Sequence, residues 1–341
     1  MSPMAAQVTV ISGGGASASR PRSQLWIAYE QYKLERQGDL VSEKTLETYQ
    51  THVEPFLTWV ADENGVRRFA DLDIGTVRAY RAREATRKGS HGRPLSPFTV
   101  LDSHKSLLTF LRWAKAEGYE FDPRILELKR PRVPKPEADV YHVSQLKEVL
   151  KACNREMPQE ELAVRILVGS GVRASELCGL ALVGPDGLSD VMTDSLARGR
   201  VELRVRWDAG AKGRKSRRVP ITAKLAAGIK AYEGRHRPHD TSFGELLINH
   251  HGRPYRRYGI DAIMDRLQRR VKFRVHAHAF RHTFATVATK LGWNFEHLRA
   301  AMGHAEYKEL QRYVRLATER DLGSRKDWLE FIVANPATDW V

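Results

Sequence analysis

The most reactive side chains of the sequence lie between His276 and Tyr313, near its C-terminal end. His278 and Arg281 are three residues apart, and in a helix this spacing places both side chains on one face, one turn apart. His304 follows in a short Met-Gly-His turn, and Tyr313 comes nine residues later inside a second helical pattern. Two imidazoles, a guanidinium and a phenol that converge in this way suit the binding of a phosphate and its attack without a metal ion.

Further candidates lie upstream of this stretch. Arg173 follows a Gly-Ser-Gly helix break and precedes a helical turn that carries Glu176. Backbone N–H groups and the helix dipole favour an anion at such a helix start. Considered alone, Arg173 and Glu176 are also an ordinary ion pair at i,i+3. Lys212 lies in a glycine-flanked turn, and Lys215 in the same turn is the competing lysine.

Other kinds of reactive site fit the sequence less well. His278 and His282 are four residues apart, but Ala279 stands where a zinc-protease helix needs glutamate. His276 and His278 would give a metal two ligands, yet no carboxylate or cysteine cluster stands nearby to complete the set. The sequence also lacks a phosphate-binding Gly-Lys-Ser/Thr loop and an acidic cluster for two-metal chemistry. We therefore expect no metal and no cofactor, and we interpret His282 as a helix-packing residue ahead of a supporting role at the site.

The charge of the chain indicates a polyanionic partner. Its 341 residues include 56 Lys and Arg against 41 Asp and Glu, a net charge of +15 that is spread over the whole sequence. This spread favours extended nucleic acid over a small anion, although a basic protein with solvated faces remains the alternative. Cys153 and Cys178 lie in apolar helical patterns and are expected to be buried thiols in a reducing cytoplasm. No apolar run approaches the roughly 18 residues that cross a bilayer, and the start does not resemble a signal peptide.

Hydrophobic periodicity predicts a mainly α-helical protein with a small β-hairpin or sheet in its second half. Residues 1–22 are rich in Ser, Gly and Ala and are expected to be a disordered tail. A domain of four helices is expected at 23–128, with helix starts at Ser42 and at Ser96-Pro97. Residues 129–139 are a basic, proline-rich linker, and the remaining residues, 140–341, form the second domain with a C-terminal tail.

Clusters of cations are candidates for tracking a phosphate backbone, although a solvated helix face is the alternative interpretation. They fall on the third helix and its following loop, on the linker, and in the turn of the hairpin. The residues are Arg78, Arg81, Arg87, Lys88, Arg93, Lys129, Arg130, Arg132, Arg214 and Lys215.

The second half combines helices with one hairpin. Ser144 is expected to cap a helix, and residues 181–199 are interpreted as an irregular insertion. Residues 200–207 alternate strictly and predict a half-buried strand, with a return strand at 219–221. The apolar face of that strand comprises Val201, Leu203, Val205 and Trp207, and its polar face Arg200, Glu202, Arg204 and Arg206. An apolar cluster from 328 to 332 is a candidate contact with a neighbouring copy of the chain, with packing on its own domain as the alternative.

The order of these motifs resembles the tyrosine recombinases, the family of phage integrases and chromosome-dimer resolvases. The series is GSGVRASELCGL, AKGRKSRRVP, HAHAFRHTFAT, MGHAE and ELQRYV, and it spans about 165–320. The first, third and fourth motifs match the wording of the family closely. The preceding helical domain and linker match its layout without a specific motif. The interval from Arg173 to Lys212 is longer than in compact members, which leaves Lys215 as the alternative lysine.

The resemblance implies a role for each residue. Arg173 and Arg281 would bind the non-bridging oxygens of a phosphodiester and stabilise the charge of the transition state. Tyr313 would attack phosphorus and form a covalent 3′-phosphotyrosine. The ordinary pKa of a phenol is about 10, so the nucleophile needs a general base, and His278 fits that role.

The remaining roles concern proton transfer and support. Lys212 would protonate the departing 5′ oxygen as general acid. His304 would donate a hydrogen bond to the phosphate, and Glu176 would orient the basic side chains around it. Because the phosphotyrosine conserves the energy of the broken bond, the reaction would need neither metal nor ATP.

The function that the resemblance implies is site-specific DNA recombination, with a mobile-element integrase ahead of a chromosome-dimer resolvase. A type IB topoisomerase and a DNA-binding regulator without catalysis are the alternatives. The expected partner is double-stranded DNA with specific recombination sites, bound by a homotetramer across two sites. The resemblance also admits an accessory DNA-bending or directionality factor. No membrane partner is expected, and the location would be the cytoplasm, associated with the nucleoid.

Overall fold

The structure is a computed structural model that describes residues 23–89, 92–134, 138–192, 201–208, 216–239, 241–304, 307–324, 326 and 328. The tail expected at 1–22 lies outside the described residues, as do Lys212, Arg214 and Lys215. The described residues fall into two compact units that divide between residues 136 and 137. Each unit has its own hydrophobic core.

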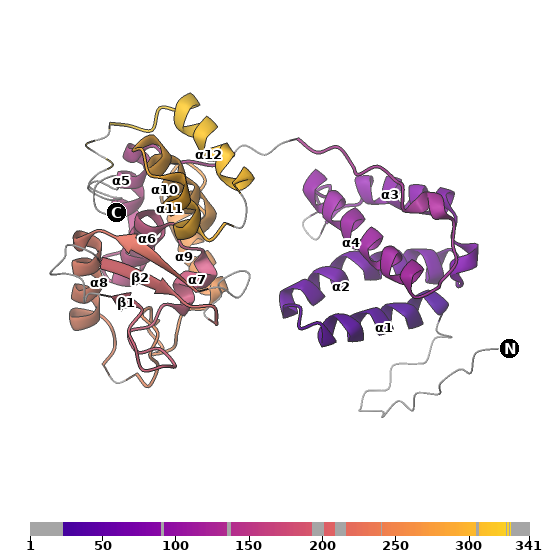
Figure 1. The fold of residues 1–341 in the computed structure, drawn as a ribbon, viewed down its shortest axis with the longest axis horizontal. Coiled ribbons are helices and arrows are strands. Elements are labelled where there is room, and N and C mark those ends of the chain that lie inside the picture. Colours follow the sequence, from indigo (N-terminus) through magenta and orange to yellow (C-terminus); the bar gives the residue numbers. More distant parts are fainter. Residues whose placement is uncertain are drawn as a thin grey trace. The chain divides into compact units, whose positions relative to one another are not determined.

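The first unit consists of helices in its described part, as the sequence predicts. Ser42 and Ser96 begin two of the helices, because each side chain accepts a hydrogen bond from the backbone N–H three residues on. Pro97 occupies the first turn, where its missing N–H costs nothing. The helices are α1 (Gln24–Gly38), α2 (Glu43–Leu57), α3 (Ile74–Thr86) and α4 (Pro97–Ala116) (Figure 1).

Aromatic side chains form the centre of the first unit. Tyr32 from α1 packs against Phe110 and Trp113 of α4, with ring centroids 5.5 and 5.3 Å apart. Tyr29 meets the edge of Phe110 at 5.6 Å. Such pairs add about 0.5–1.5 kcal/mol each to the stabilisation from burial. Helix α3 packs on α4, and this packing fixes the position of the basic residues that α3 carries.

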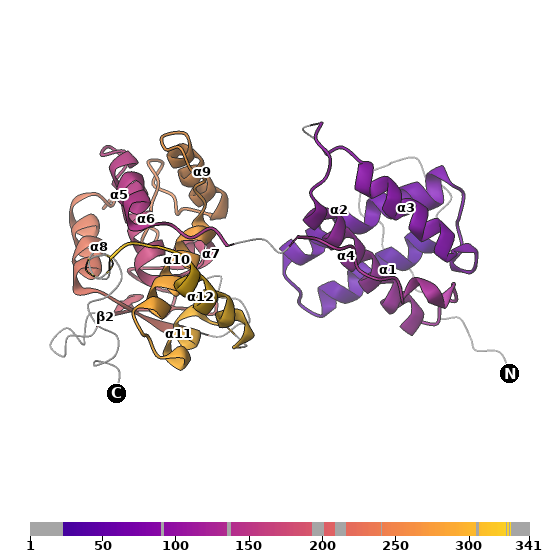
Figure 2. The same ribbon diagram turned by 90° about the horizontal axis from the view of Figure 1, so that it is seen from above.

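The second unit combines helices with a small sheet (Figure 1). Helix α10 runs through its core, where it packs against α6 and α12, as Figure 2 also indicates. The mainly helical fold with a small antiparallel sheet is therefore confirmed. Its helices are α5 (Val143–Ala152), α6 (Pro158–Ser170), α7 (Ala174–Gly179), α8 (Ala223–Arg235), α9 (Arg257–Gln268), α10 (Ala277–Lys290), α11 (Phe295–Met302) and α12 (Lys308–Glu319).

Gly171 ends α6 at the predicted helix break. Its backbone is left-handed, with φ of +64°, a conformation that favours glycine. A Cβ atom at this position would lie 2.4 Å from Cδ1 of Phe284 on α10. Glycine is therefore needed both for the turn and for the close approach of α10, which brings the site elements together.

The sheet has three antiparallel strands in the order β1 (Val191–Met192), β2 (Val201–Val205) and β3 (Arg217–Ile221). The predicted alternation is confirmed on β2, where Val201, Leu203 and Val205 are buried. The assignment of Trp207 to that buried face is wrong, since its side chain is 57% exposed. The strand ends at Val205, so the alternation no longer applies two residues later.

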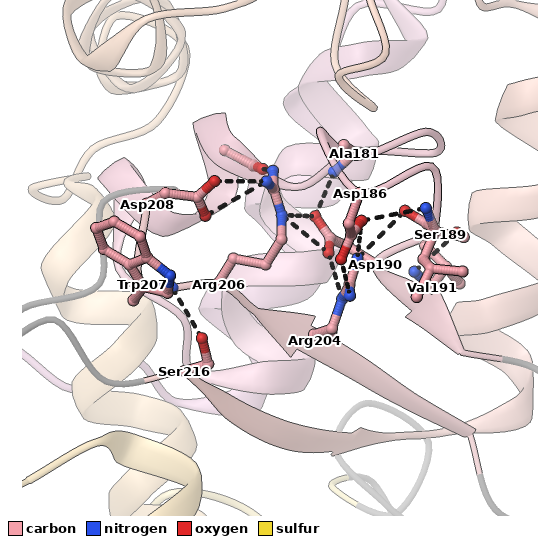
Figure 3. A network of polar contacts seen from close by, with 12 residues as sticks. Ala181, Asp186, Ser189, Asp190, Val191, Arg204, Arg206, Trp207, Asp208 and Ser216 are labelled. Carbon is pink, nitrogen blue, oxygen red and sulfur yellow. Dashed lines mark hydrogen bonds and ion pairs between the residues drawn. The ribbon is translucent and has the colours of Figure 1, made fainter.

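The interpretation of 181–199 as wholly irregular is wrong in its described part, 181–192. β1 lies within this stretch and pairs with β2, and Asp190, the residue before β1, is fully buried. Its carboxylate accepts hydrogen bonds from Arg204 Nε at 2.9 Å and Arg206 Nε at 3.0 Å, and from the Ala181 backbone at 2.9 Å (Figure 3). Arg204 on β2 and Arg206 just after it thus anchor the stretch through one buried carboxylate.

Two further expectations need correction. The N-cap of α5 is His142, not Ser144, because the imidazole Nδ1 accepts the Ser144 backbone N–H at 3.1 Å. Trp328 is 1% exposed within the core of its own unit, and its indole Nε1 donates to the Leu322 carbonyl at 2.6 Å. The proposed contact with a neighbour is therefore wrong for Trp328, and residues 329–332 lie outside the described residues.

Cys153 and Cys178 are unpaired and only half-buried. Burial raises the pKa of the Cys178 thiol to about 11. Among the helices in the described part of the chain, none combines the length and the apolar character needed to span a bilayer.

Candidate functional site

Arg173 and Glu176 form a rigid pair at the start of α7. The Arg173 backbone N–H and its Nη1 each donate to the Glu176 carboxylate at 2.7 Å. Glu176 is 1% exposed, whereas the Arg173 side chain keeps 22% of its surface in solvent. The ion pair expected from the i,i+3 spacing is confirmed. Arg173 is held in place and still reaches the surface.

Arg281 is held between two backbone segments. Its Nη1 donates to the Gly171 carbonyl at 2.6 Å, and its Nη2 donates to the Met302 carbonyl. Its side chain is among the largest fully buried in the described residues. Burial and the positive charge of Arg173 lower the pKa of Arg281 to about 9, so the group remains charged at neutral pH.

Arg217 on β3 belongs to the same cluster, although the sequence analysis did not select it. Its Nη1 and Nη2 donate to the two Glu176 oxygens at 2.9 and 2.6 Å. Burial alone would raise the pKa of Glu176, but the hydrogen bonds and charge of Arg217 and Arg173 outweigh it and hold the pKa at about 2. One signal was available: Arg217 has the same parity along β3 as Val219 and Ile221, which face the core.

The charges of this cluster do not balance. Three guanidinium groups, those of Arg173, Arg217 and Arg281, gather around the single buried carboxylate of Glu176. Because Arg281 is bound by neutral carbonyl groups, its charge is oriented without being cancelled. A cluster with surplus positive charge and fixed donors is suited to binding an anion such as phosphate.

Tyr313 extends from α12 into the same region and is 2% exposed. Its hydroxyl lies 3.1 Å from Nδ1 of His282, so the interpretation of His282 as a packing residue alone is wrong. Arg312 Nη2 lies 3.4 Å from His282 Nε2, and a guanidinium can only donate. Nε2 is therefore the acceptor, and Nδ1 carries the proton that it donates to the phenol oxygen.

Burial is the main influence on the acidity of the Tyr313 hydroxyl. It raises the pKa of Tyr313, and the charge of Arg281 partly offsets this effect. The phenol is therefore neutral at neutral pH, and its own proton is available to a separate base. Burial and the charge of neighbouring groups lower the pKa of His282 to about 3, so its imidazole is also neutral.

His278 and His304 lie on either side of this contact. The ring of His278 stands 4.1 Å from the ring of His282, centroid to centroid, and its side chain reaches solvent. Partial desolvation and the charge of Arg281 lower the pKa of His278 to about 4, which leaves a neutral imidazole that can accept a proton. His304 stacks on the Tyr313 ring at 6.1 Å and 12°, and burial and Arg281 lower its pKa to about 3.

The structure thus brings Arg173, Glu176, Arg281, His304 and Tyr313 together. His278 lies beside them, with its ring against that of His282, the partner of Tyr313. Lys212 and Lys215 lie outside the described residues, and β3 begins at Arg217, two positions after Lys215. Among the described residues, no group of three His, Cys, Asp or Glu side chains is placed to hold a metal ion.

The cations selected as candidates for DNA contact differ in their surroundings. Arg81 and Arg87 are half-buried, and Arg87 pairs with the buried Glu84 at 2.7 Å, so part of its charge serves the fold. The exposed ones are Arg78, Lys88, Arg93, Lys129, Arg130 and Arg132. Arg214 and Lys215 lie outside the described residues.

Comparison with known proteins gives one consistent result. Residues 140–320 match the sequence profile of the phage integrase family. A tyrosine recombinase of Thermosipho africanus is 24% identical over 293 residues, which cover 84% of this chain and 93% of that protein. Tyrosine recombinase XerC of Nitrobacter winogradskyi is 27% identical over 298 residues, covering 82% and 86%.

Solved structures show the same fold. A lambda integrase dimer bound to a core site matches 87% of this chain and 97% of its own, with a TM-score of 0.63 and 13% identity. The Tn1549 transposon integrase in complex with transposon right end DNA matches 90% and 98%, with a TM-score of 0.62 and 15% identity.

Proposed function

We propose a mechanism, residue by residue, for this chain, which belongs to the phage integrase family of tyrosine recombinases and is a site-specific DNA recombinase. Such an enzyme breaks and rejoins DNA strands. The proposal concerns which groups perform the steps. It rests on one observation, the convergence of the Tyr313 phenol with the guanidinium groups of Arg281 and Arg173, whose charges both act on the phenol.

In the first step, Arg173 and Arg281 bind the non-bridging oxygens of the scissile phosphate. Their positive charge reduces the repulsion between the phosphate and the nucleophile and stabilises the charge that builds up in the transition state. Tyr313 then attacks phosphorus. The bond from phosphorus to the Tyr313 oxygen forms, and the bond to the 5′ oxygen of the DNA breaks.

Each proton in this step has a defined destination. The phenol proton passes to His278, which is neutral at physiological pH and therefore able to accept it. Lys212 donates a proton to the departing 5′ oxygen, with Lys215 as the competing donor. His304 donates a hydrogen bond to the phosphate, and His282 holds the phenol oxygen.

The product is a 3′-phosphotyrosine and a free 5′ hydroxyl. Attack by the 5′ hydroxyl of a partner strand reverses the chemistry and releases Tyr313. One bond to phosphorus forms as another breaks in each step, so the reaction consumes no ATP and needs no metal ion. Because Tyr313 is 2% exposed in this structure, its hydroxyl has to leave His282 or become accessible beside it when DNA binds.

A covalent-adduct assay tests the mechanism. Duplexes that bind the protein are selected from a random pool, nicked to trap the cleaved product, and incubated with the protein before denaturing electrophoresis. We expect an adduct with the wild type, in the presence or absence of chelator, and none with Tyr313→Phe. An adduct that persists in Tyr313→Phe would mean that another residue is the nucleophile, and full inhibition by chelator would refute the metal-free reaction.

The finer biological role that we propose is integration of a mobile element, with resolution of chromosome dimers as the alternative. A two-plasmid assay separates the two, since an integrase joins sites on different molecules. Four strand cuts are needed to exchange two duplexes, and we propose four protomers on two sites, at the nucleoid. Native mass spectrometry of the protein with a two-site DNA tests this count. Because Trp328 belongs to the core of its own unit, a truncation that tests assembly has to follow Trp328.

A further inference from the structure

We infer that Arg217 is a positioning residue that aligns Arg173 with the turn before His304, a role that rests on the proposed function of those two residues. Arg217 is the first residue of β3 and follows Lys212 by five positions in the sequence. Its side chain is 10% exposed. A charged group that is so far removed from water needs strong partners.

The contacts of Arg217 join three separate segments of the chain. Nη1 and Nη2 bind both oxygens of Glu176 on α7. Nε donates to the Ala301 carbonyl at 2.7 Å, near the end of α11. One planar group thus links β3 to α7 and to the turn that leads into His304.

The carboxylate of Glu176 connects Arg217 to Arg173, because both guanidinium groups bind it. Its Oε1 accepts from Nη1 of Arg217 at 2.9 Å and from Nη1 of Arg173 at 2.7 Å. Because both carboxylate oxygens are held by Arg217, Glu176 is prevented from rotating, and the position of the Arg173 guanidinium is set through the shared oxygen. Lysine would offer a single ammonium group, which does not reproduce the two parallel bonds.

Gly303 provides the space for this arrangement. A Cβ atom there would lie 3.1 Å from Arg217 Nη1 and 3.2 Å from its Cζ and Nε. The backbone at Gly303 is also left-handed, with φ of +62°. The glycine before His304 therefore allows the turn to lie directly against the Arg217 guanidinium, which ties the location of His304 to that of Arg217.

Arg217 is distinguished from Arg173 by its partners. All three of its side-chain nitrogens already donate to protein acceptors. Arg173, in contrast, is the more exposed of the two arginines that share Glu176. Arg217 therefore acts on the phosphate through Arg173, and its effect should depend on the negative charge of the phosphate.

The test compares Arg217→Gln and Arg217→Lys with Arg218→Gln, a neighbour on the opposite face of β3 that is 65% exposed. Adduct formation is measured at saturating DNA on the normal duplex and on one with a methylphosphonate at the scissile position. The methyl group replaces a charged oxygen, so the neutral phosphate needs less help from Arg173. DNA affinity and Tm are measured for every variant.

A misplaced Arg173 should slow adduct formation by about 100-fold in Arg217→Gln and by about 10-fold in Arg217→Lys, with DNA affinity unchanged. On the methylphosphonate duplex both deficits should fall several-fold, while Arg218→Gln matches wild type on both duplexes. Equal deficits on the two duplexes, in either variant, or a normal rate in Arg217→Gln would overturn the inference. Tyr313→Phe must be inactive on both duplexes, and an adduct there refutes the proposed nucleophile, not the role of Arg217.

Discussion

Replacing Glu176 with glutamine removes the buried negative charge that joins Arg173 to Arg217. The pKa of Glu176 is held at about 2, against an ordinary value of 4.5. At about 1.4 kcal/mol per pKa unit, this depression corresponds to about 3 kcal/mol of folding free energy at neutral pH. The loss on removing one partner of a buried ion pair, about 3–5 kcal/mol, is of the same size.

The dependence on pH follows from the direction of the shift. A carboxyl group whose pKa is lowered by folding stabilises the protein above its unfolded pKa, and this contribution is lost as the pH falls toward the folded pKa. The stability difference between wild type and Glu176→Gln should therefore be full at pH 7.5. At pH 3.5, one unit below the ordinary pKa, it should be smaller by about 1.4 kcal/mol.

The two cysteines supply the assay. Cys153 and Cys178 are the only cysteines of the chain, and both lie in the second unit. After equilibration in urea, a pulse of 4,4′-dithiodipyridine, a thiol reagent that stays active in acid, reports the unfolding of that unit alone. A stability difference that does not change between pH 7.5 and pH 3.5 would refute the assignment of the charge to Glu176.

Two further predictions concern the contacts of α10. His282→Phe leaves the buried Tyr313 hydroxyl without its partner and should reduce the free energy of unfolding by about 1–3 kcal/mol. A double-mutant cycle with Tyr313→Phe, measured by urea unfolding, should show coupling between the two positions. Additive losses of stability would contradict the contact. Gly171→Ala should cost about 2–5 kcal/mol from the left-handed backbone and the clash with Phe284, whereas Gly187→Ala, with φ of +75° and open space, should cost only about 1–2 kcal/mol.

Local patterns were enough to predict the parts of the site that lie close together in sequence. The Arg173–Glu176 pair follows from a three-residue spacing, and the end of α6 follows from the glycine of the helix break. The alternation of β2 predicted its buried face as far as the strand extends. In each case the determining interaction spans only a few residues, so the spacing of those residues in the sequence is enough to predict it.

Contacts between distant segments could not be predicted in the same way. His282 shares a helix face with His278, but nothing in that pattern reveals that Tyr313 of α12 would pack on it. The partners of Asp190 are two arginines on and just after a strand that follows a stretch without clear periodicity. A strand as short as β1 carries no measurable alternation. Arg217 shares the parity of Val219 and Ile221 along β3, but the predicted return strand began only at 219, and parity does not reveal the contact with Glu176.

The way in which the cluster is held explains how it keeps its charge. A carboxylate orients an arginine strongly but also cancels its field, whereas a backbone carbonyl orients it through a dipole and leaves the full charge in place. Glu176 is divided between Arg173 and Arg217, and Arg281 is held by carbonyls alone. If each arginine had its own carboxylate, the site would be equally rigid but nearly neutral, and it would lose its attraction for phosphate. Sharing one carboxylate between two arginines therefore provides order while two positive charges remain for the DNA.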